Sequence, residues 1–145
     1  MWLKCLADLI FPRKCEICGR LLTGDERYIC EDCMEDMPLT YYWDWPENPA
    51  EKKLWVRTHL HRVIPLFFYT RESRYITLIH KIKYQGKAHL GHHMGFMLGE
   101  KLRGVLSDVD YVVPIPLHPI RRWRRGYNQA EIIAGGVTEA LFGKE

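Results

Sequence analysis

The sequence lacks long apolar runs, and it lacks cysteine everywhere after residue 33. A membrane-spanning helix needs about 18 or more consecutive apolar residues, so no such helix is predicted and we expect a cytoplasmic protein. The sequence also has little excess charge, because the net charge is only +3. An excess this small does not predict a general nucleic-acid-binding surface, and the local placement of charge therefore matters more than its total.

All five cysteines lie within the first 33 residues, and four of them form two C-x-x-C pairs. The pairs are Cys15 with Cys18 and Cys30 with Cys33. Paired C-x-x-C turns at this separation are typical of a structural zinc site with four thiolate ligands. The alternatives are two disulfides, which need an exported protein, or a redox pair. We expect residues 1–38 to be a module around a closed, structural Zn²⁺ site, with Cys5 packed in the apolar N-terminal turn.

Residues 39–59 are rich in aromatic residues and proline and show no clear period, so we interpret them as a linker. Their aromatic cluster is Tyr41, Tyr42, Trp43 and Trp45. Exposed rings among basic residues would suit single-stranded nucleic acid, but the neighbours here are Asp44 and Glu47. The pattern favours rings that tie the cysteine module to the next domain.

Residues 60–107 combine one β-rich run with two helical patterns. The run 60–70 contains Pro65, which indicates an edge strand or a bulge. The spacing then predicts a helix from Ser73 to Tyr84, ended by Gly86, and a second helix over residues 88–106. Three histidines of the second helix have metal-capable spacing, but no carboxylate sits at a matching turn, so we interpret them as surface residues. They are His89, His92 and His93.

Residues 109–145 have the pattern of a buried strand that leads into a basic loop and a helix. The apolar, β-branched run 109–115 predicts a strand covered on both faces, which is typical of a parallel sheet. Two prolines end it, and residues 116–127 follow as a loop with four arginines. Asn128 and Glu131 have the spacing of a capping box, which predicts a helix over 128–142. Open α/β sheets bind ligands between a strand's carboxyl end and a helix start.

The sequence resembles ComF-type competence proteins, a branch of the type I phosphoribosyltransferases. The string VVPIPLHPIRRWRRGYNQAE, the segment IHKIKYQGKAHL and the four-cysteine module carry the resemblance, which covers essentially the whole chain. It implies an α/β fold, α+β for the chain as it stands. An N-terminal zinc ribbon would precede the first part of a Rossmann-type phosphoribosyltransferase domain in residues 60–145, in which residues 60–107 form the hood.

The resemblance and the chemistry of guanidinium together predict a phosphate or pyrophosphate site, since arginine binds such groups bidentately while staying charged. The predicted ligands are Arg121, Arg124, Arg125, Gly126, Tyr127 and Asn128. The candidate substrate-side residues are Lys81, Lys83, Tyr84 and His118. Of these, His118 invites a general-base role, although no partner for it is visible in the sequence. No catalytic residue is predicted, and Mg²⁺ is expected to accompany phosphoribosyl pyrophosphate.

By resemblance, the function would be binding of phosphoribosyl pyrophosphate or pyrophosphate in a protein linked to DNA uptake during natural competence. The alternative is a non-catalytic component of the uptake machinery that binds single-stranded DNA or a helicase partner through the same arginines. Members of the family continue into a DDVxTTGxT-like segment that holds the 5-phosphate and ribose, and this sequence contains none. We therefore leave enzymatic activity open and expect no phosphoribosyltransferase turnover from the chain as given.

Overall fold

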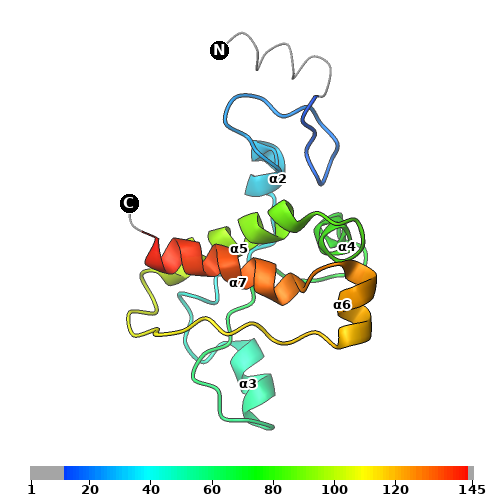
Figure 1. The fold of residues 1–145 in the computed structure, drawn as a ribbon. Helices are drawn as coiled ribbons and strands as arrows, with labels where there is room; N and C mark the ends of the chain where they lie inside the picture. The colour runs from blue at the N-terminus through cyan, green and yellow to red at the C-terminus, as the bar shows by residue number, and fades with distance from the viewer. Residues whose placement is uncertain (1–11, 144–145) are drawn as a thin grey trace. The chain divides into compact units, whose positions relative to one another are not determined.

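The structure is a computed structural model that describes residues 12–143. The chain divides into two units, one formed by Met1–Pro38 with Tyr69–Ile79 and the other by Leu39–Phe68 with His80–Glu145. The helices of the described residues are α2 (Glu31–Glu35), α3 (Pro49–Trp55), α4 (Ile76–Tyr84), α5 (Ala88–Leu102), α6 (Pro119–Arg125) and α7 (Gln129–Phe142) (Figure 1). Within residues 12–143 no helix is long and apolar enough to cross a membrane.

In the first unit, a short hairpin and α2 are held together by polar contacts. An isolated antiparallel bridge joins Lys14 to Leu21. The buried hydroxyl of Tyr75 donates to the Cys33 carbonyl at 3.0 Å. The guanidinium of the preceding residue, Arg74, pairs with the Asp36 carboxylate at 2.7 Å. These contacts join the 69–79 segment to the end of α2, so this unit is built from two parts of the sequence.

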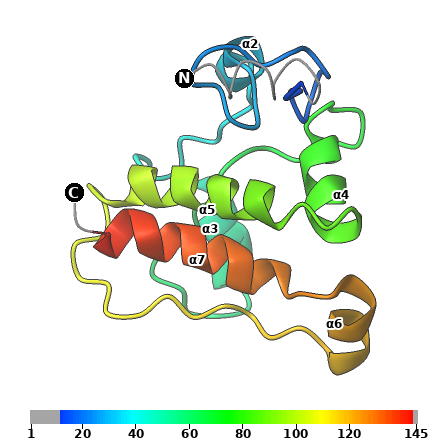
Figure 2. The same cartoon turned by 45° about the horizontal axis from the view of Figure 1, so that its top comes forward.

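In the second unit, α5 and α7 lie side by side in both views of the ribbon (Figures 1 and 2). The two helices approach closely because glycines of each helix face the backbone of the other. A Cβ on Gly95 would collide with the Ile133 carbonyl, and one on Gly136 would collide with the His92 carbonyl. A third glycine, Gly99, leaves room for a methyl group of α7. Small residues at such a contact let two helix backbones come into direct contact.

The core of the second unit gathers around Trp43, Leu102 and Val137. Trp43 is buried, and Tyr42 packs edge-on against Trp45 and Phe68. The aromatic residues 41–45 thus include core residues of this unit. Tyr41 and Trp45 of the same cluster are more than half exposed.

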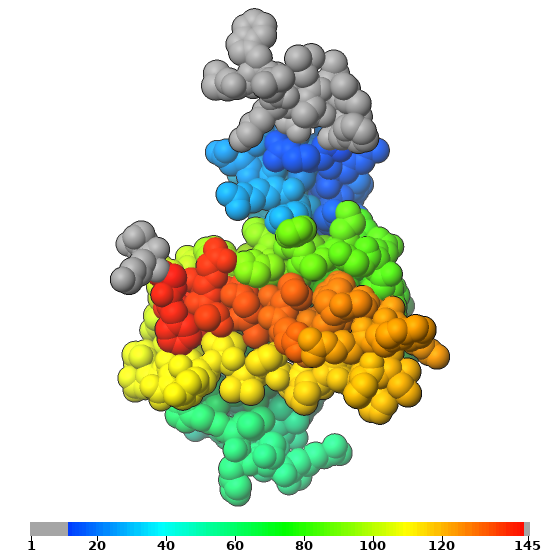
Figure 3. Space-filling model, viewed as in Figure 1, coloured from blue at the N-terminus to red at the C-terminus, as the bar shows by residue number. Residues whose placement is uncertain are grey.

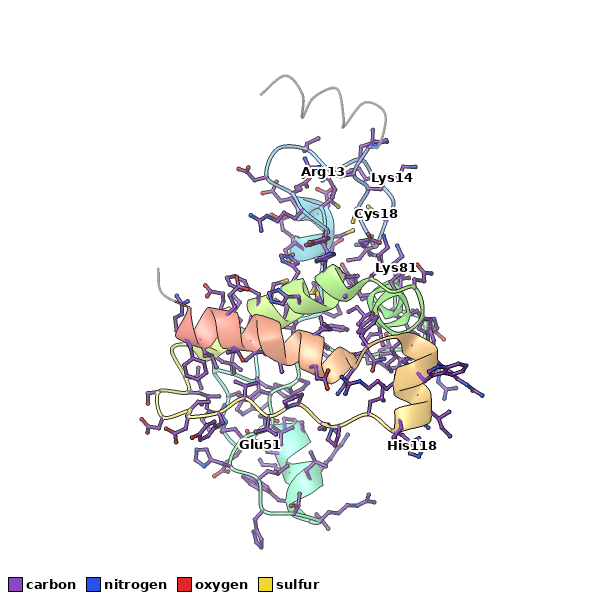
Figure 4. All side chains as sticks on the ribbon, in the orientation of Figure 1. Arg13, Lys14, Cys18, Glu51, Lys81 and His118 are labelled. Atoms are coloured by element: carbon purple, nitrogen blue, oxygen red, sulfur yellow. The ribbon has the colours of Figure 1, made fainter. Side chains whose placement is uncertain are left out.

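The predicted linker differs from the structure, because residues 49–55 form α3. The Asn48 side chain accepts from backbone amides of the first turn. The side chain of Glu51, at the third helical position, accepts in turn from the Asn48 amide, which completes a capping box. Pro49 fits the first helical position, where no N–H is needed. Glu51 is fully buried near the start of α3 (Figure 4) and pairs with Arg62 at 3.0 Å. The sequence contains this capping-box pattern as Asn-Pro-x-Glu, but the other prolines of the segment favoured its interpretation as a linker.

The prediction of an α/β fold is corrected in one respect: the described residues form a zinc-ribbon-like module and a mostly helical region, with no strand. The predicted strand 109–115 has no regular secondary structure and no partner strand among the described residues. Its ribbon runs as an elongated trace (Figure 1), and its atoms lie at the surface in the space-filling view (Figure 3). Its side chains alternate, since Val112 packs on the core cluster while Tyr111 and Val113 are more than 80% exposed. A strand needs a neighbour to satisfy its backbone groups, and the described residues supply none.

Other elements differ from the predictions in their bounds. Residues 60–70 make only one isolated bridge, between Leu39 and Phe67, because Pro65 has no N–H to donate to a ladder. The helix predicted from Ser73 begins at Ile76, and the helix predicted to residue 106 ends at Leu102. Gly86 has the predicted left-handed conformation after α4. The segment predicted as a basic loop, 116–127, contains α6.

Candidate functional site

The four predicted metal-binding cysteines come together in the first unit, with their sulfur atoms all within 4.8 Å of one another. The Sγ atoms of Cys18 and Cys30 are 3.6 Å apart. A tetrahedral site with Zn–S bonds of about 2.3 Å requires sulfur separations of roughly 3.8 Å. All four are free thiols, which excludes disulfides among them in this structure. The cluster is consistent with structural zinc, and Cys5 lies outside the described residues.

Local backbone structure explains how the sulfurs converge. In the first C-x-x-C turn, the Gly19 amide donates to the Cys15 carbonyl at 3.0 Å, and Gly19 takes a φ of 77°, a conformation that glycine adopts without a steric penalty. The second pair lies on a helix start, with Cys30 as the N-cap of α2 and Cys33 inside it. One turn and one helix end therefore present two sulfurs each to a common point.

The thiols sit in different electrostatic environments. Burial raises the pKa of Cys15, but amides of the Cys18, Cys30 and Ile17 backbone donate to its sulfur, and the net effect lowers its pKa to about 6. The pKa of Cys33 is raised instead, by burial and by the neighbouring thiols. Several thiols this close cannot all ionise unless a cation compensates their charge. A divalent metal would supply that compensation.

The second candidate site begins with α6, whose ends are defined by residues around the arginines. His118 is its N-cap, with Nδ1 accepting from the Ile120 amide at 3.3 Å, and Figure 4 shows it at the start of the helix. Pro119 follows at the first helical position, and Gly126 ends the helix in the left-handed conformation, with a φ of 79°. This short helix orders the arginine cluster on a defined scaffold.

The arginines of α6 and the end of α4 line one open pocket of about 500 Å³. Its lining residues are Lys83, Tyr84, Gly86, Arg121, Arg124 and Arg125. Residues about 40 positions apart in the sequence thus meet, and the lining includes four cations and no carboxylate. Such a concentration of positive charge in a concave surface attracts anions. Gly86 is a lining residue that the sequence did not single out, although its turn position was predicted.

Two contacts fix α6 against the end of α4. The Arg125 guanidinium lies 5.4 Å from the centroid of the Tyr84 ring, within the range of a cation–π interaction. Two residues on, the Tyr127 hydroxyl donates to the Ile82 carbonyl. Burial raises the Tyr127 pKa, against a lowering by the nearby Arg125 charge, so the phenol remains a donor at neutral pH. These contacts assign Arg125 and Tyr127 to shaping the pocket wall.

The remaining predicted site residues lie outside the pocket lining. Asn128 is buried, and its side chain caps α7 at Ala130 N and donates to the Ile115 carbonyl at 3.0 Å. It therefore joins the extended segment to α7. Glu131, predicted to complete a capping box, accepts instead from Arg122 at 3.3 Å. His118 and Lys81 do not line the pocket either.

The chain is similar to known proteins in its N-terminal module and, distantly, over a longer alignment. A family model described as a double zinc ribbon domain matches residues 6–42. The N-terminal module is a double zinc ribbon. A Haemophilus influenzae protein named competence protein F is 29% identical over 69 residues, which cover 44% of this chain and 30% of that protein. The chain is thus a distant homologue of competence protein F, which confirms the ComF-type resemblance, and it matches only about 30% of that relative's length. No solved structure matches the chain.

Proposed function

We propose that the pocket between α4 and α6 binds a diphosphate group, as carried by pyrophosphate or phosphoribosyl pyrophosphate. The observation that carries this proposal is the pocket lining of four cations without a carboxylate. Guanidinium groups bind phosphate oxygens bidentately, and lysine adds a compact charge. The ComF-type resemblance favours the same assignment, because the string that carries it includes Arg121, Arg124 and Arg125.

The cationic lining residues would contact a diphosphate from different sides. Arg121 and Arg124 have exposed side chains and no ion pair among the described residues, so both are free to turn toward a ligand. Lys83 would approach from the end of α4. Arg125, held over Tyr84, would add its charge from the wall. Stabilising charge by preplaced donors in this way requires no covalent step by the protein.

Magnesium is expected to enter with the ligand. Mg²⁺ prefers oxygen ligands and usually keeps several waters while binding phosphates. The pocket lining offers it no carboxylate, so its ligands would be phosphate oxygens and water. The lining also contains no evident nucleophile or general base, and the proposal is therefore one of binding. Phosphoribosyl transfer would need groups beyond those of this pocket.

The test is titration with magnesium pyrophosphate, monitored by calorimetry, of the wild type and two single variants. Arg124→Ala removes a lining cation, and we expect about a tenfold loss of affinity, since a charge-assisted bond contributes on the order of 1.5–3 kcal/mol. Arg122→Ala is the matched control, because it removes the same charge from the same helix at a residue paired with Glu131. Equal affinity in Arg124→Ala and wild type, or an equal loss in both variants, would refute the assignment.

We further propose that Cys15, Cys18, Cys30 and Cys33 bind one structural zinc ion. The support is the clustering of the four sulfurs and the double zinc ribbon match. A site with four protein ligands has no open position for catalysis. Elemental analysis should give one zinc per chain, and Cys30→Ser should lower it. A zinc content near zero in the wild type, or unchanged content in Cys30→Ser, would contradict the proposal.

The alternative function is a non-catalytic role in DNA uptake, for which the similarity to a protein named competence protein F is the specific support. In that role the same pocket would contact phosphates of single-stranded DNA or an acidic surface of a helicase partner. Direct titration separates the two functions. Binding of magnesium pyrophosphate that Arg124→Ala weakens favours the diphosphate site, whereas binding of single-stranded DNA that Arg124→Ala weakens, without binding of magnesium pyrophosphate, favours the alternative.

A further inference from the structure

The four cysteines of the proposed zinc site differ in their exposure to solvent. Cys15, Cys30 and Cys33 are at most 2% exposed. Cys18, which lies in the hairpin of the first unit (Figure 4), is exposed. Oxidation of a cysteine follows its exposure and its thiolate character, and all four sulfurs must be thiolates to bind zinc. Cys18 is therefore the ligand that a dissolved oxidant reaches first.

A second thiol lies beside Cys18. The Sγ atoms of Cys18 and Cys30 are 3.6 Å apart, so they need to approach by only about 1.5 Å to reach the length of a disulfide bond. Cys30 is the N-cap of α2, and a helix end adjusts more easily than a helix interior. Cys15 is a poorer partner, because the Ile17 and Cys30 amides donate to its sulfur at 3.5 and 3.4 Å and hold it in place.

We propose that Cys18 is a site of oxidation by peroxides and that Cys30 resolves the oxidised sulfur to a disulfide, which releases the metal. The inference rests on the proposed zinc site. The Cys18 thiolate attacks one peroxide oxygen, so that an S–O bond forms, the O–O bond breaks and hydroxide leaves. The sulfur gives two electrons to the peroxide and becomes a sulfenic acid. The Cys30 thiolate then attacks this sulfur, the S–S bond forms, the S–O bond breaks, and a second hydroxide leaves. Protons from solvent convert both hydroxides to water.

Such a disulfide removes one ligand from each C-x-x-C pair. Cys15 and Cys33 remain, and two thiolates do not complete the tetrahedral shell of a structural zinc site. The metal then dissociates, and the first unit loses stability because metal binding and folding are coupled. Apart from the cysteines, the buried apolar side chains among the described residues of this unit are Ile29, Met37, Tyr75 and Leu78. A dithiol reverses the reaction by thiol–disulfide exchange, so the site is a reversible redox switch.

The experiment treats the full, zinc-loaded 145-residue chain with hydrogen peroxide and follows zinc release with a chromogenic chelator. Zinc content before the oxidant is added tests the proposed zinc site by itself. After treatment the wild type should lose its zinc, and non-reducing peptide mapping by mass spectrometry should find Cys18 joined to Cys30. Dithiothreitol with added zinc should restore the metal. Zinc that stays bound under peroxide, or a disulfide between any other two cysteines, would overturn the inference and leave the zinc site standing.

Cys18→His removes the exposed thiol and keeps a fourth ligand, because histidine is an ordinary ligand of structural zinc. This variant should bind zinc and release it at least about tenfold more slowly under peroxide, since susceptibility follows exposure. Cys5→Ser is the matched control, because it removes a thiol outside the predicted ligand set, and it should release zinc at the wild-type rate. Equal release from Cys18→His and the wild type would contradict the assignment.

Alkylation of the zinc-loaded wild type gives a second measurement that needs no change in the ligands. With limiting iodoacetamide, peptide mapping should find Cys18 labelled before the three buried ligands, because the reagent meets the exposed sulfur first. Labelling of Cys15, Cys30 or Cys33 ahead of Cys18 would overturn the assignment of the oxidation site, whatever the behaviour of Cys18→His.

Discussion

Replacing Gly136 by alanine tests the close approach of α5 and α7, on which the second unit depends. The new Cβ would meet the His92 carbonyl and lie 2.6 Å from the Phe96 amide nitrogen. Both are backbone atoms in the middle of a helix, so neither can rotate away. Relief requires the two helices to separate, which loosens the cluster of Trp43, Leu102 and Val137.

Two opposing terms set the size of the effect. Alanine is favoured over glycine inside a helix by about 1 kcal/mol. Overpacking at a rigid contact costs about 1–3 kcal/mol and occasionally more, and a clash with backbone belongs at the upper end of that range. We therefore expect Gly136→Ala to lower the free energy of unfolding by roughly 2 kcal/mol, a factor of about 30 in the folded-to-unfolded ratio.

Gly135→Ala is the matched control, because it changes the adjacent residue of the same helix in the same way. Its Cβ would lie 3.6 Å from the nearest atom, a His92 ring carbon, which is ordinary contact. Only the propensity gain then remains, so this variant should be more stable than the wild type by up to about 1 kcal/mol. Urea unfolding followed by far-ultraviolet circular dichroism measures both. Equal midpoints for Gly136→Ala and Gly135→Ala would refute this account of the helix contact.

Three further substitutions test other contacts. Burial raises the Glu51 pKa, but the Val63 amide and Arg62 lower it below its ordinary value on balance. Glu51→Gln should therefore destabilise the protein at pH 7, and the difference from wild type should begin to shrink as the pH falls below the ordinary glutamate pKa of about 4.3 and disappear once the pH is below the lowered pKa of the folded state; a constant difference would contradict the pairing. Asn128→Ala removes the α7 cap and the bond to the Ile115 carbonyl and should cost about 1–2 kcal/mol in urea unfolding, whereas an unchanged midpoint would remove its structural role. Tyr75→Phe loses the buried bond to Cys33 and should cost about 1 kcal/mol, while the exposed Tyr111→Phe should be neutral.

The cysteine site could be predicted from the sequence because its information is local. A C-x-x-C turn places two sulfurs by backbone geometry alone, and two such turns need only one metal-sized space between them. Gly19 and Gly86 could be predicted for the same reason, as positive φ at a turn is a property of one residue. The capping of α7 by Asn128 could also be predicted, because it depends only on neighbouring residues. The predicted contribution of Glu131 to a capping box was wrong, since Arg122 from the preceding helix pairs with its carboxylate.

The predicted strand at 109–115 fails for a non-local reason. Its β-branched residues favour an extended backbone, and the ribbon of this segment runs as an elongated trace without regular secondary structure (Figure 1). A ladder, however, depends on a second segment at the right distance, which composition cannot supply. The sequence pattern indicated burial on both faces, yet only alternate side chains pack inward, with Val112 on the core and Ile115 79% exposed. The apolar run thus predicted a strand that the described residues do not form, and it overstated the burial of the segment.

The basic pocket was predicted as a set of residues, but its assembly depends on α6, which was expected to be loop. Four arginines within five residues would repel one another in a flexible segment. In the structure, His118 and Gly126 fix the two ends of a helix, Arg122 turns to Glu131, and the pocket-facing arginines remain together. Tyr127 and Arg125 then attach this helix to α4, from which Lys83 comes. Because these contacts hold the cations together before any ligand arrives, a diphosphate would meet a preorganised site, and neutralising their mutual repulsion would add to its affinity.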